Sequence, residues 1–106
     1  MHSRKHHLIK KAREILKPQT LELLASADIN LNGWQILERW SRKSPEALKA
    51  LESRGHDIFL DRLLEQQQLE QEILMGEAGL ESVVNGLSHT EILRLHAVRP
   101  ELELYN

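Results

Sequence analysis

The chain has 106 residues, of which 41% are hydrophobic and 28% are charged. This length and composition are typical of one small globular domain and argue against a disordered chain. Cysteine is absent, which excludes disulfide bonds, a thiolate nucleophile and a cysteine-based zinc site. No apolar stretch approaches the ~18 residues that span a membrane. We therefore expect a single domain over residues 1–106, located in the cytoplasm and without contact to a membrane.

The net charge of −2 conceals two regions of opposite sign. Residues 1–17 contain six Lys or Arg and one Glu, which gives +5, whereas residues 57–106 contain three Arg and ten Asp or Glu, which gives −7. Two such regions can attract each other, within one fold or head to tail between copies, and the basic region can also bind an anionic partner. Pairing of the two regions with each other, within the fold or head to tail between copies, is the favoured interpretation because it requires no external partner.

Leucine accounts for 20 residues, whereas Trp, Tyr and Phe together account for four. Leucine suits helices, and the residues that favour strands are few. A chain of this size cannot enclose a deep substrate cavity beside its core. We predict an all-α fold, a compact array or bundle of about five to seven short helices with one longer helix over residues 57–75 and an extended C-terminal tail.

The first two helices are predicted from apolar spacing and from one proline. Three- and four-residue spacing of apolar side chains predicts a helix over residues 3–16. The side chains are Leu8, Ile9, Ala12, Ile15 and Leu16. Pro18 fits the first turn of a second helix, where its missing N–H costs little. This second helix should end near Ala27.

Residues 28–33 form a predicted loop, because two asparagines and a glycine in this stretch favour turns. A third helix is expected over residues 34–42. Trp34 and Trp40 cannot share one narrow face of that helix at their spacing. We therefore expect Trp40 in the core and Trp34 at its edge or on the surface.

Ser44 and Pro45 predict the start of a fourth helix, with the serine as N-cap and the proline at the first helical position. Gly55 is its expected C-terminal stop. The longest helix, over residues 57–75, then carries an apolar stripe that three glutamines interrupt. Gly76 and Gly79 are expected to bracket its end.

Two short elements complete the chain. A sixth helix carries the apolar side chains Leu80, Val83, Val84 and Leu87. Ser88 and Glu91 predict a capping box, in which each side chain accepts a hydrogen bond from the backbone N–H of the other, at the start of a last helix that ends near residue 97. Residues 101–105 are expected to form an extended tail that packs on the bundle or on a neighbouring chain.

The histidines do not predict a metal site. His2, His6 and His7 have helical spacing near the N-terminus, but exposed terminal imidazoles bind metals adventitiously and lack the ordered surroundings of a dedicated site. His89 and His96 share one face of the last helix, and no third ligand follows at a recognisable spacing. We expect no metal and no other cofactor.

An enzyme is the least supported class. Asp57, Asp61 and Glu65 form a row on the long helix, and His56 lies beside it; such carboxylates can act as acid and base, but a solvated helix face has the same pattern. The glycines and serines form no phosphate-binding loop and no nucleophile elbow. We expect a non-enzymatic protein and name no catalytic residue.

Nucleic-acid binding is the alternative function. The basic residues within 4–17 could contact phosphates and would make binding sensitive to salt. They are Arg4, Lys5, Lys10, Lys11, Arg13 and Lys17. Residues 80–97 also outline a helix-turn-helix, but the net charge of the C-terminal half repels phosphate.

Protein–protein association is the leading prediction, either with another protein or as a homodimer. Polar residues within an apolar helical stripe can set the register and oligomeric state of paired helices, and Trp is enriched in binding hot spots. The candidate contact residues lie on the long helix and around the first tryptophan. They are Trp34, Phe59, Leu63, Gln66, Gln67, Glu70 and Ile73. The expected role is that of a helical adaptor, regulator or inhibitor.

Overall fold

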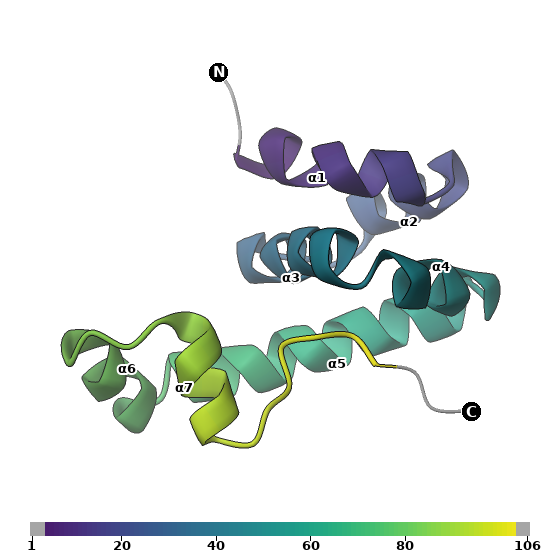
Figure 1. The fold of residues 1–106 in the computed structure, drawn as a ribbon. Helices are drawn as coiled ribbons and strands as arrows, with labels where there is room; N and C mark the ends of the chain where they lie inside the picture. The colour runs from purple at the N-terminus through teal and green to yellow at the C-terminus, as the bar shows by residue number, and fades with distance from the viewer. Residues whose placement is uncertain (1–3, 104–106) are drawn as a thin grey trace.

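The computed structural model describes residues 4–103, with side chains from Lys10 onward, and the described part is an all-α fold of seven helices (Figure 1). The helices are α1 (Arg4–Ile15), α2 (Pro18–Ser26), α3 (Leu31–Lys43), α4 (Pro45–Ser53), α5 (His56–Leu74), α6 (Glu77–Val84) and α7 (His89–Leu95). The predicted fold class, the single long helix and the proline at the start of α2 and of α4 are confirmed.

The helix α3 lies at the centre of the arrangement. It packs against α1 on one side and α5 on the other, while α6 and α7 gather at the C-terminal end of α5 (Figure 1). The molecule measures 42 × 40 × 21 Å, so its thin dimension accommodates about two helix diameters of ~10 Å each. Across the described residues, none of the helices is both long and apolar enough to cross a membrane.

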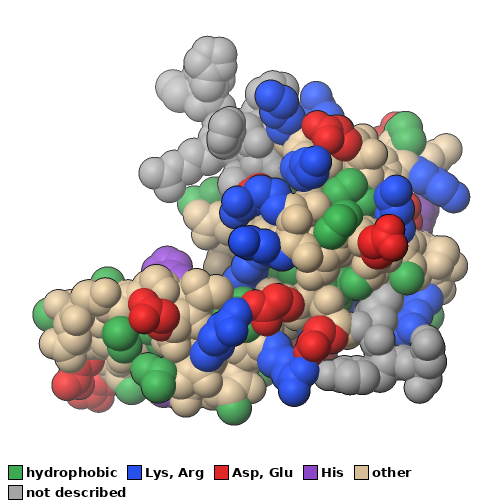
Figure 2. All heavy atoms as spheres, in the orientation of Figure 1, with side chains coloured by type: hydrophobic (Ala, Val, Ile, Leu, Met, Phe, Trp, Pro, Cys, Tyr) green, Lys and Arg blue, Asp and Glu red, His purple; other side chains and the backbone are tan. Residues whose placement is uncertain are grey.

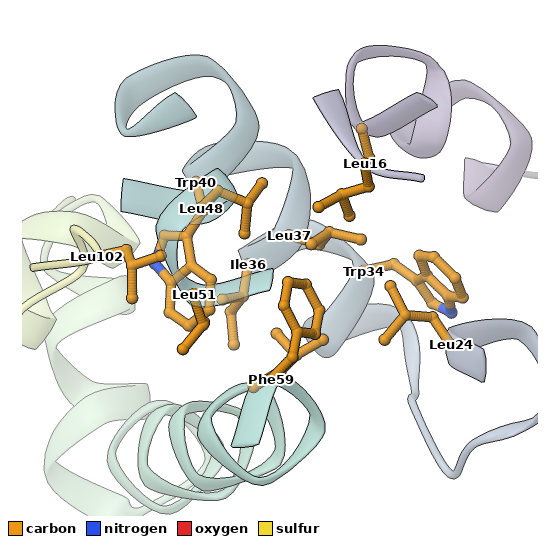
Figure 3. Packing of buried hydrophobic residues seen from close by; sticks show 12 residues of the cluster. Leu16, Leu24, Trp34, Ile36, Leu37, Trp40, Leu48, Leu51, Phe59 and Leu102 are labelled. Carbon is orange, nitrogen blue, oxygen red and sulfur yellow. The ribbon is translucent and has the colours of Figure 1, made fainter. Parts of the chain in front are cut away.

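The larger of two hydrophobic cores lies among α1 to α5. Trp34, Trp40 and Phe59 are its largest side chains, and all three are buried. Figure 3 shows Phe59 projecting from α5 toward Leu37 of α3, and Leu102 of the C-terminal segment beside Trp40. Trp34 is 4% exposed, so the expectation that it lies at the edge of the core or on the surface is wrong.

The smaller core lies between the end of α5 and α7. Its buried side chains are Leu74, Ile92 and Leu93, with Ile73, Leu87 and Val98 partly buried against them. The predicted capping box fixes the start of α7: Ser88 Oγ accepts from Glu91 N at 3.2 Å, and Glu91 Oε1 accepts from Ser88 N at 2.9 Å.

Two helices begin earlier than their turn-forming residues suggest. The helix α3 starts at Leu31 because Asn30 is its N-cap and accepts a hydrogen bond from Gly33 N at 3.0 Å. The helix α6 starts at Glu77 and contains Gly79, which was expected to mark a helix end. At both positions a Cβ atom would collide with a neighbouring segment. This close approach explains why a glycine occupies a position inside a helix.

Two further expectations are modified in detail. Ser44 is the N-cap residue of α4, but its side chain makes no capping hydrogen bond. The C-terminal tail packs on its own bundle as far as it is described, with Leu102 3% exposed within the larger core. Tyr105 lies outside the described residues.

Candidate functional site

The predicted contact residues lie largely inside the fold. Ile73 is partly buried. The other six side chains are buried: Trp34, Phe59, Leu63, Gln66, Gln67 and Glu70. The stripe of α5 that carries most of them faces α3 and the C-terminal segment. These side chains are therefore not accessible to a partner in this fold, because other parts of the same chain already cover them.

A buried polar cluster occupies the glutamine-rich part of this stripe. Arg39 Nη2 of α3 donates to Glu70 Oε2 of α5 at 2.5 Å, and Gln66 Nε2 donates to the same carboxylate oxygen at 2.7 Å. Burial raises the pKa of Glu70, and the hydrogen bonds from Gln66 and Arg39 oppose that shift. Burial likewise lowers the pKa of Arg39, whose Nε atom has no acceptor among the described residues. Desolvation of both charges thus limits what this pair contributes to stability.

The same cluster holds the C-terminal segment on the bundle. Gln66 Nε2 also donates to Arg99 O at 2.8 Å, and Trp40 Nε1 donates to Pro100 O at 3.0 Å. With the burial of Leu102, these bonds fix the segment across α3 and α5. The hydrogen bonds of Gln66 are therefore made within one chain.

Gln67 sets the position of the start of α3. Its Oε1 atom accepts from Asn30 N at 3.2 Å, and its backbone oxygen accepts from Asn32 Nδ2 at 3.4 Å. A Cβ atom at Gly33 would lie 2.0 Å from Gln67 Oε1 and 2.7 Å from Ile29 Cγ2. Glycine therefore allows the two helices to approach closely here.

A groove of about 310 Å³ opens at the C-terminal end of α5. It is lined by Asn32, Gln71, Leu74, Met75, Leu80, Val83 and His89. Met75 is 68% exposed and Leu80 is 51% exposed, and the neighbouring Val84 is 84% exposed. Exposed apolar side chains that adjoin one another mark interaction surfaces more often than isolated ones do. This groove is the candidate site.

Gly79 brings the two walls of the groove together. A Cβ atom at this position would lie 2.0 Å from the backbone oxygen of Ile73. The helix α6 can therefore lie against the last turn of α5 only with glycine at this position. That close approach places Leu80 of α6 beside Met75 and Leu74 in the lining of one groove.

One signal for this site is present in the sequence, but it was not interpreted as a binding surface. Leu80, Val83 and Val84 have the three- and four-residue spacing of an apolar helix face, and the sequence predicts them on a sixth helix. In the structure all three are exposed. The reason is that α7 packs against α5 through Ile92 and Leu93 and leaves this face of α6 uncovered.

The surface around the groove is acidic. Between Arg62 and Arg94 the sequence contains no Lys or Arg. Figure 2 shows red and green side chains but no blue ones over α6, whereas blue side chains gather over α1 and α3. The two charged regions remain apart, since no ion pair among the described residues joins α1 to residues 57–103.

Two larger hollows have a different character. One, of about 480 Å³, lies among residues 94–103 and is lined by the ion pairs Arg94–Glu101 and Arg99–Glu103. The other, of about 380 Å³, lies along the outer face of α5 and contains Asp61. Both are open, and charged side chains supply about half of the lining residues of each, whereas ligand sites are lined mostly by apolar side chains.

The residues weighed for catalysis do not converge. Asp57, Asp61 and Glu65 are exposed on the outer face of α5. His56 Nε2 lies 3.3 Å from Thr20 Oγ1, which donates to Glu52 Oε2 at 2.6 Å. Because the threonine is 0% exposed, its hydroxyl is part of the packing of α2 against α4 and α5 and is not accessible to a substrate.

The candidate metal ligands are likewise separate. His89 and His96 are both exposed. Within the described residues, no group of three or more His, Cys, Asp or Glu side chains is placed to hold a metal ion. The side chains of the N-terminal histidines His2, His6 and His7 lie outside the described part.

The basic residues of the alternative function are exposed where they are described. Lys10, Lys11, Arg13 and Lys17 all face solvent, and Lys11 Nζ forms an ion pair with Glu14 at 3.2 Å. The side chains of the other two candidates, Arg4 and Lys5, lie outside the described residues.

Comparison of the chain with protein families, with characterised proteins and with solved structures finds no match in any of the three. The functional argument therefore depends on the groove, its charge and the exposed basic helix.

Proposed function

We propose that this protein is a non-enzymatic interaction module whose groove between α5 and α6 binds a helical segment of another protein. The observation that carries the proposal is the exposure of Met75, Leu80 and Val83 in the lining of the groove. Covering such side chains removes apolar surface from water, which favours binding by about 25 cal/mol for each Å² buried.

The form of the groove supports a helical ligand. Its apolar walls come from two helices, with Met75 at the end of α5 and Leu80 and Val83 on α6. An amphipathic helix binds such a groove through side chains at three- and four-residue spacing. Addition of a peptide strand to a sheet edge requires a sheet, and the described residues form none.

A peptide-display selection tests this proposal. A random library is selected against the wild type, and the enriched peptides are then measured against Leu80→Asp and Leu95→Asp. Leu95 is 69% exposed on α7 but does not line the groove, so it is a matched control. We expect Leu80→Asp to weaken binding about tenfold or more and Leu95→Asp to leave it unchanged.

The same selection can contradict the proposal. No enrichment of amphipathic peptides, or enrichment that Leu80→Asp leaves intact, would show that the groove does not bind helices. Circular dichroism of both variants establishes that they retain their helices. Because the substituted side chains are exposed, we expect neither substitution to disturb the packing of the cores.

The exposed basic face of α1 supports nucleic-acid binding as a second candidate function. Lys10, Lys11 and Arg13 are exposed, and the acidic half of the chain does not pair with them among the described residues. This candidate predicts binding to duplex DNA or single-stranded RNA that weakens steeply with salt. The triple variant Lys10→Ala/Lys11→Ala/Arg13→Ala should abolish it. No binding at low salt would reject this function.

A further inference from the structure

Among Asp, Glu, Lys and Arg, the stretch of chain that supplies six of the seven groove-lining residues contains only acidic side chains. From residue 63 to residue 93 every Asp, Glu, Lys or Arg is a glutamate. One of them, Glu70, is buried in the ion pair with Arg39. The exposed ones are Glu65, Glu72, Glu77, Glu81 and Glu91.

Two of these glutamates lie on α6, which forms one wall of the groove. Glu77 precedes Leu80 by three residues and therefore shares its face of the helix, and Glu81 follows Leu80 directly. Neither forms an ion pair with a described residue. A positively charged ligand in the groove would therefore find uncompensated carboxylates on α6, whereas Glu72 of α5 lines the hollow on the outer face of that helix.

A second copy of this chain is a poor occupant for two reasons. Two grooves facing each other would bring their acidic rims together, and juxtaposed like charges disfavour association. The basic helix α1 has the correct sign, but of its described apolar side chains Ala12 is buried in the larger core and Ile15 is partly buried against it. The described part of α1 can thus offer positive charge to the rim, but its apolar side chains already pack in its own core.

Building on the function proposed above, we infer that the occupant is a basic amphipathic helix of another protein. Its apolar side chains contact Met75, Leu80 and Val83, and its Lys or Arg residues flank them and face the glutamates of the rim. Exposed ion pairs add little affinity individually. They instead raise the association rate and discriminate against acidic partners.

Synthetic peptides of about 15 residues test the inference. Three peptides share one helical spacing of leucines and differ only in their polar positions, which are all Lys, all Gln or all Glu. A fourth has the Lys composition with its leucines scattered around the helix. Fluorescence anisotropy at low and at physiological salt measures their binding. At low salt we expect the Lys peptide to bind about tenfold more tightly than the Gln peptide, and the Glu and scattered peptides more weakly still.

Two double variants locate the effect. Glu77→Gln/Glu81→Gln removes one first-turn and one exposed mid-helix carboxylate from α6. Glu22→Gln/Glu46→Gln removes a mid-helix carboxylate from α2 and a first-turn carboxylate from α4. The first variant should reduce the preference for Lys over Gln several-fold, and the second should preserve it. Higher salt should reduce the preference in the wild type because the charges are exposed.

The outcomes separate the two proposals. Equal binding of the Lys and Gln peptides, both dependent on Leu80, would overturn the basic partner and retain the groove. Equal binding of the scattered Lys peptide would also overturn it, since charge alone would then suffice. Binding that Leu80→Asp does not weaken would overturn the groove itself. Concentration-dependent dimerisation in sedimentation, abolished by Leu80→Asp, would assign the groove to a second copy and contradict the inference.

Discussion

The two hydrophobic cores differ in what they bury and in what they leave exposed. The larger core holds both tryptophans and Phe59, and α3 separates it into contacts with α1 on one side and α5 on the other. The smaller core has Leu74, Ile92 and Leu93 as its buried side chains. Beside it lies the exposed groove. Regions with few buried apolar contacts open more readily than the rest of a protein, so we expect the candidate binding site to lie in the less stable region.

Truncation of one side chain in each core should reveal this difference. Phe59→Ala should lower the free energy of unfolding by about 4 kcal/mol and Leu93→Ala by about 3 kcal/mol, since both side chains are 0% exposed. Hydrogen exchange then locates each effect. Phe59→Ala should accelerate exchange throughout α3 and α5, whereas Leu93→Ala should accelerate it first in α6 and α7.

A uniform acceleration of exchange would contradict the difference in stability between the two cores. If Leu93→Ala accelerated exchange in α1 and α3 as much as in α7, the chain would unfold as one cooperative unit. Urea unfolding followed by tryptophan fluorescence is a useful second measurement, because both tryptophans belong to the larger core.

Removing one partner of the Arg39–Glu70 ion pair should lower the free energy of unfolding, whereas replacing both partners with apolar side chains should change it little. Glu70 is 2% exposed and Arg39 is 19% exposed, so Glu70→Leu leaves a largely buried guanidinium without its carboxylate. We expect a loss of about 3 kcal/mol in the free energy of unfolding. The double variant Arg39→Met/Glu70→Leu should return to within about 1 kcal/mol of the wild type.

The pH dependence of this pair has a defined sign. Burial raises the pKa of Glu70 above its value in the unfolded chain. The contribution of this group to stability is therefore fully present below the unfolded pKa and is lost as the pH rises through the folded pKa. The double variant should lack this dependence in chemical denaturation between acidic and neutral pH. The stability of the double variant is a separate test. If it were as unstable as Glu70→Leu, the ion pair itself would stabilise the fold, and the uncompensated charge of Arg39 would not account for the loss.

The two helix glycines should respond unequally to substitution by alanine. At Gly79 the new Cβ atom would meet a backbone oxygen at 2.0 Å, and at Gly33 it would meet the end of the Gln67 side chain at the same distance. Backbone cannot move aside as a side chain can, so Gly79→Ala should cost about 2 kcal/mol and Gly33→Ala about 1 kcal/mol. Thermal unfolding monitored by circular dichroism measures both. A gain of stability at either position would show that the intrinsic helix preference for alanine outweighs the close approach.

The glycines also show how far the sequence could predict this structure. The longest helix and the Ser88–Glu91 capping box follow from signals within a few residues, and both are confirmed. Gly33 and Gly79 were interpreted as turn or end signals, whereas the structure uses them for contacts with segments distant in sequence or across a turn. Local propensity contains no information about such contacts.

The candidate site was beyond prediction for a related reason. An apolar helical stripe predicts that something covers it, but it does not specify whether the cover belongs to the same chain. The stripe of α5 that contains Leu63 is covered internally, whereas the stripe of α6 that contains Leu80 is exposed. Likewise, nothing in the sequence pairs Arg39 with Glu70 before α3 and α5 are packed together.

The smallest expected effect concerns the pH dependence of α7. The backbone N–H of Ser88 donates to the carboxylate of Glu91 and lowers its pKa. The stabilisation by this group is thus present above the unfolded pKa, about 4.3 for an ordinary glutamate, and is lost as the pH falls through the lower folded pKa. Acidification therefore weakens α7 through Glu91, whereas through Glu70 it favours the folded state.

Glu91→Gln separates this effect from other acid-induced changes, because glutamine can complete the capping box without titrating. Hydrogen exchange in α7 at decreasing pH should show a loss of protection in the wild type that the variant lacks, after correction for the intrinsic exchange rate. Equal acid dependence in both proteins would assign the loss to another group. Because His89 at the start of α7 lines the groove, the same acidification should weaken peptide binding more in the wild type than in Glu91→Gln.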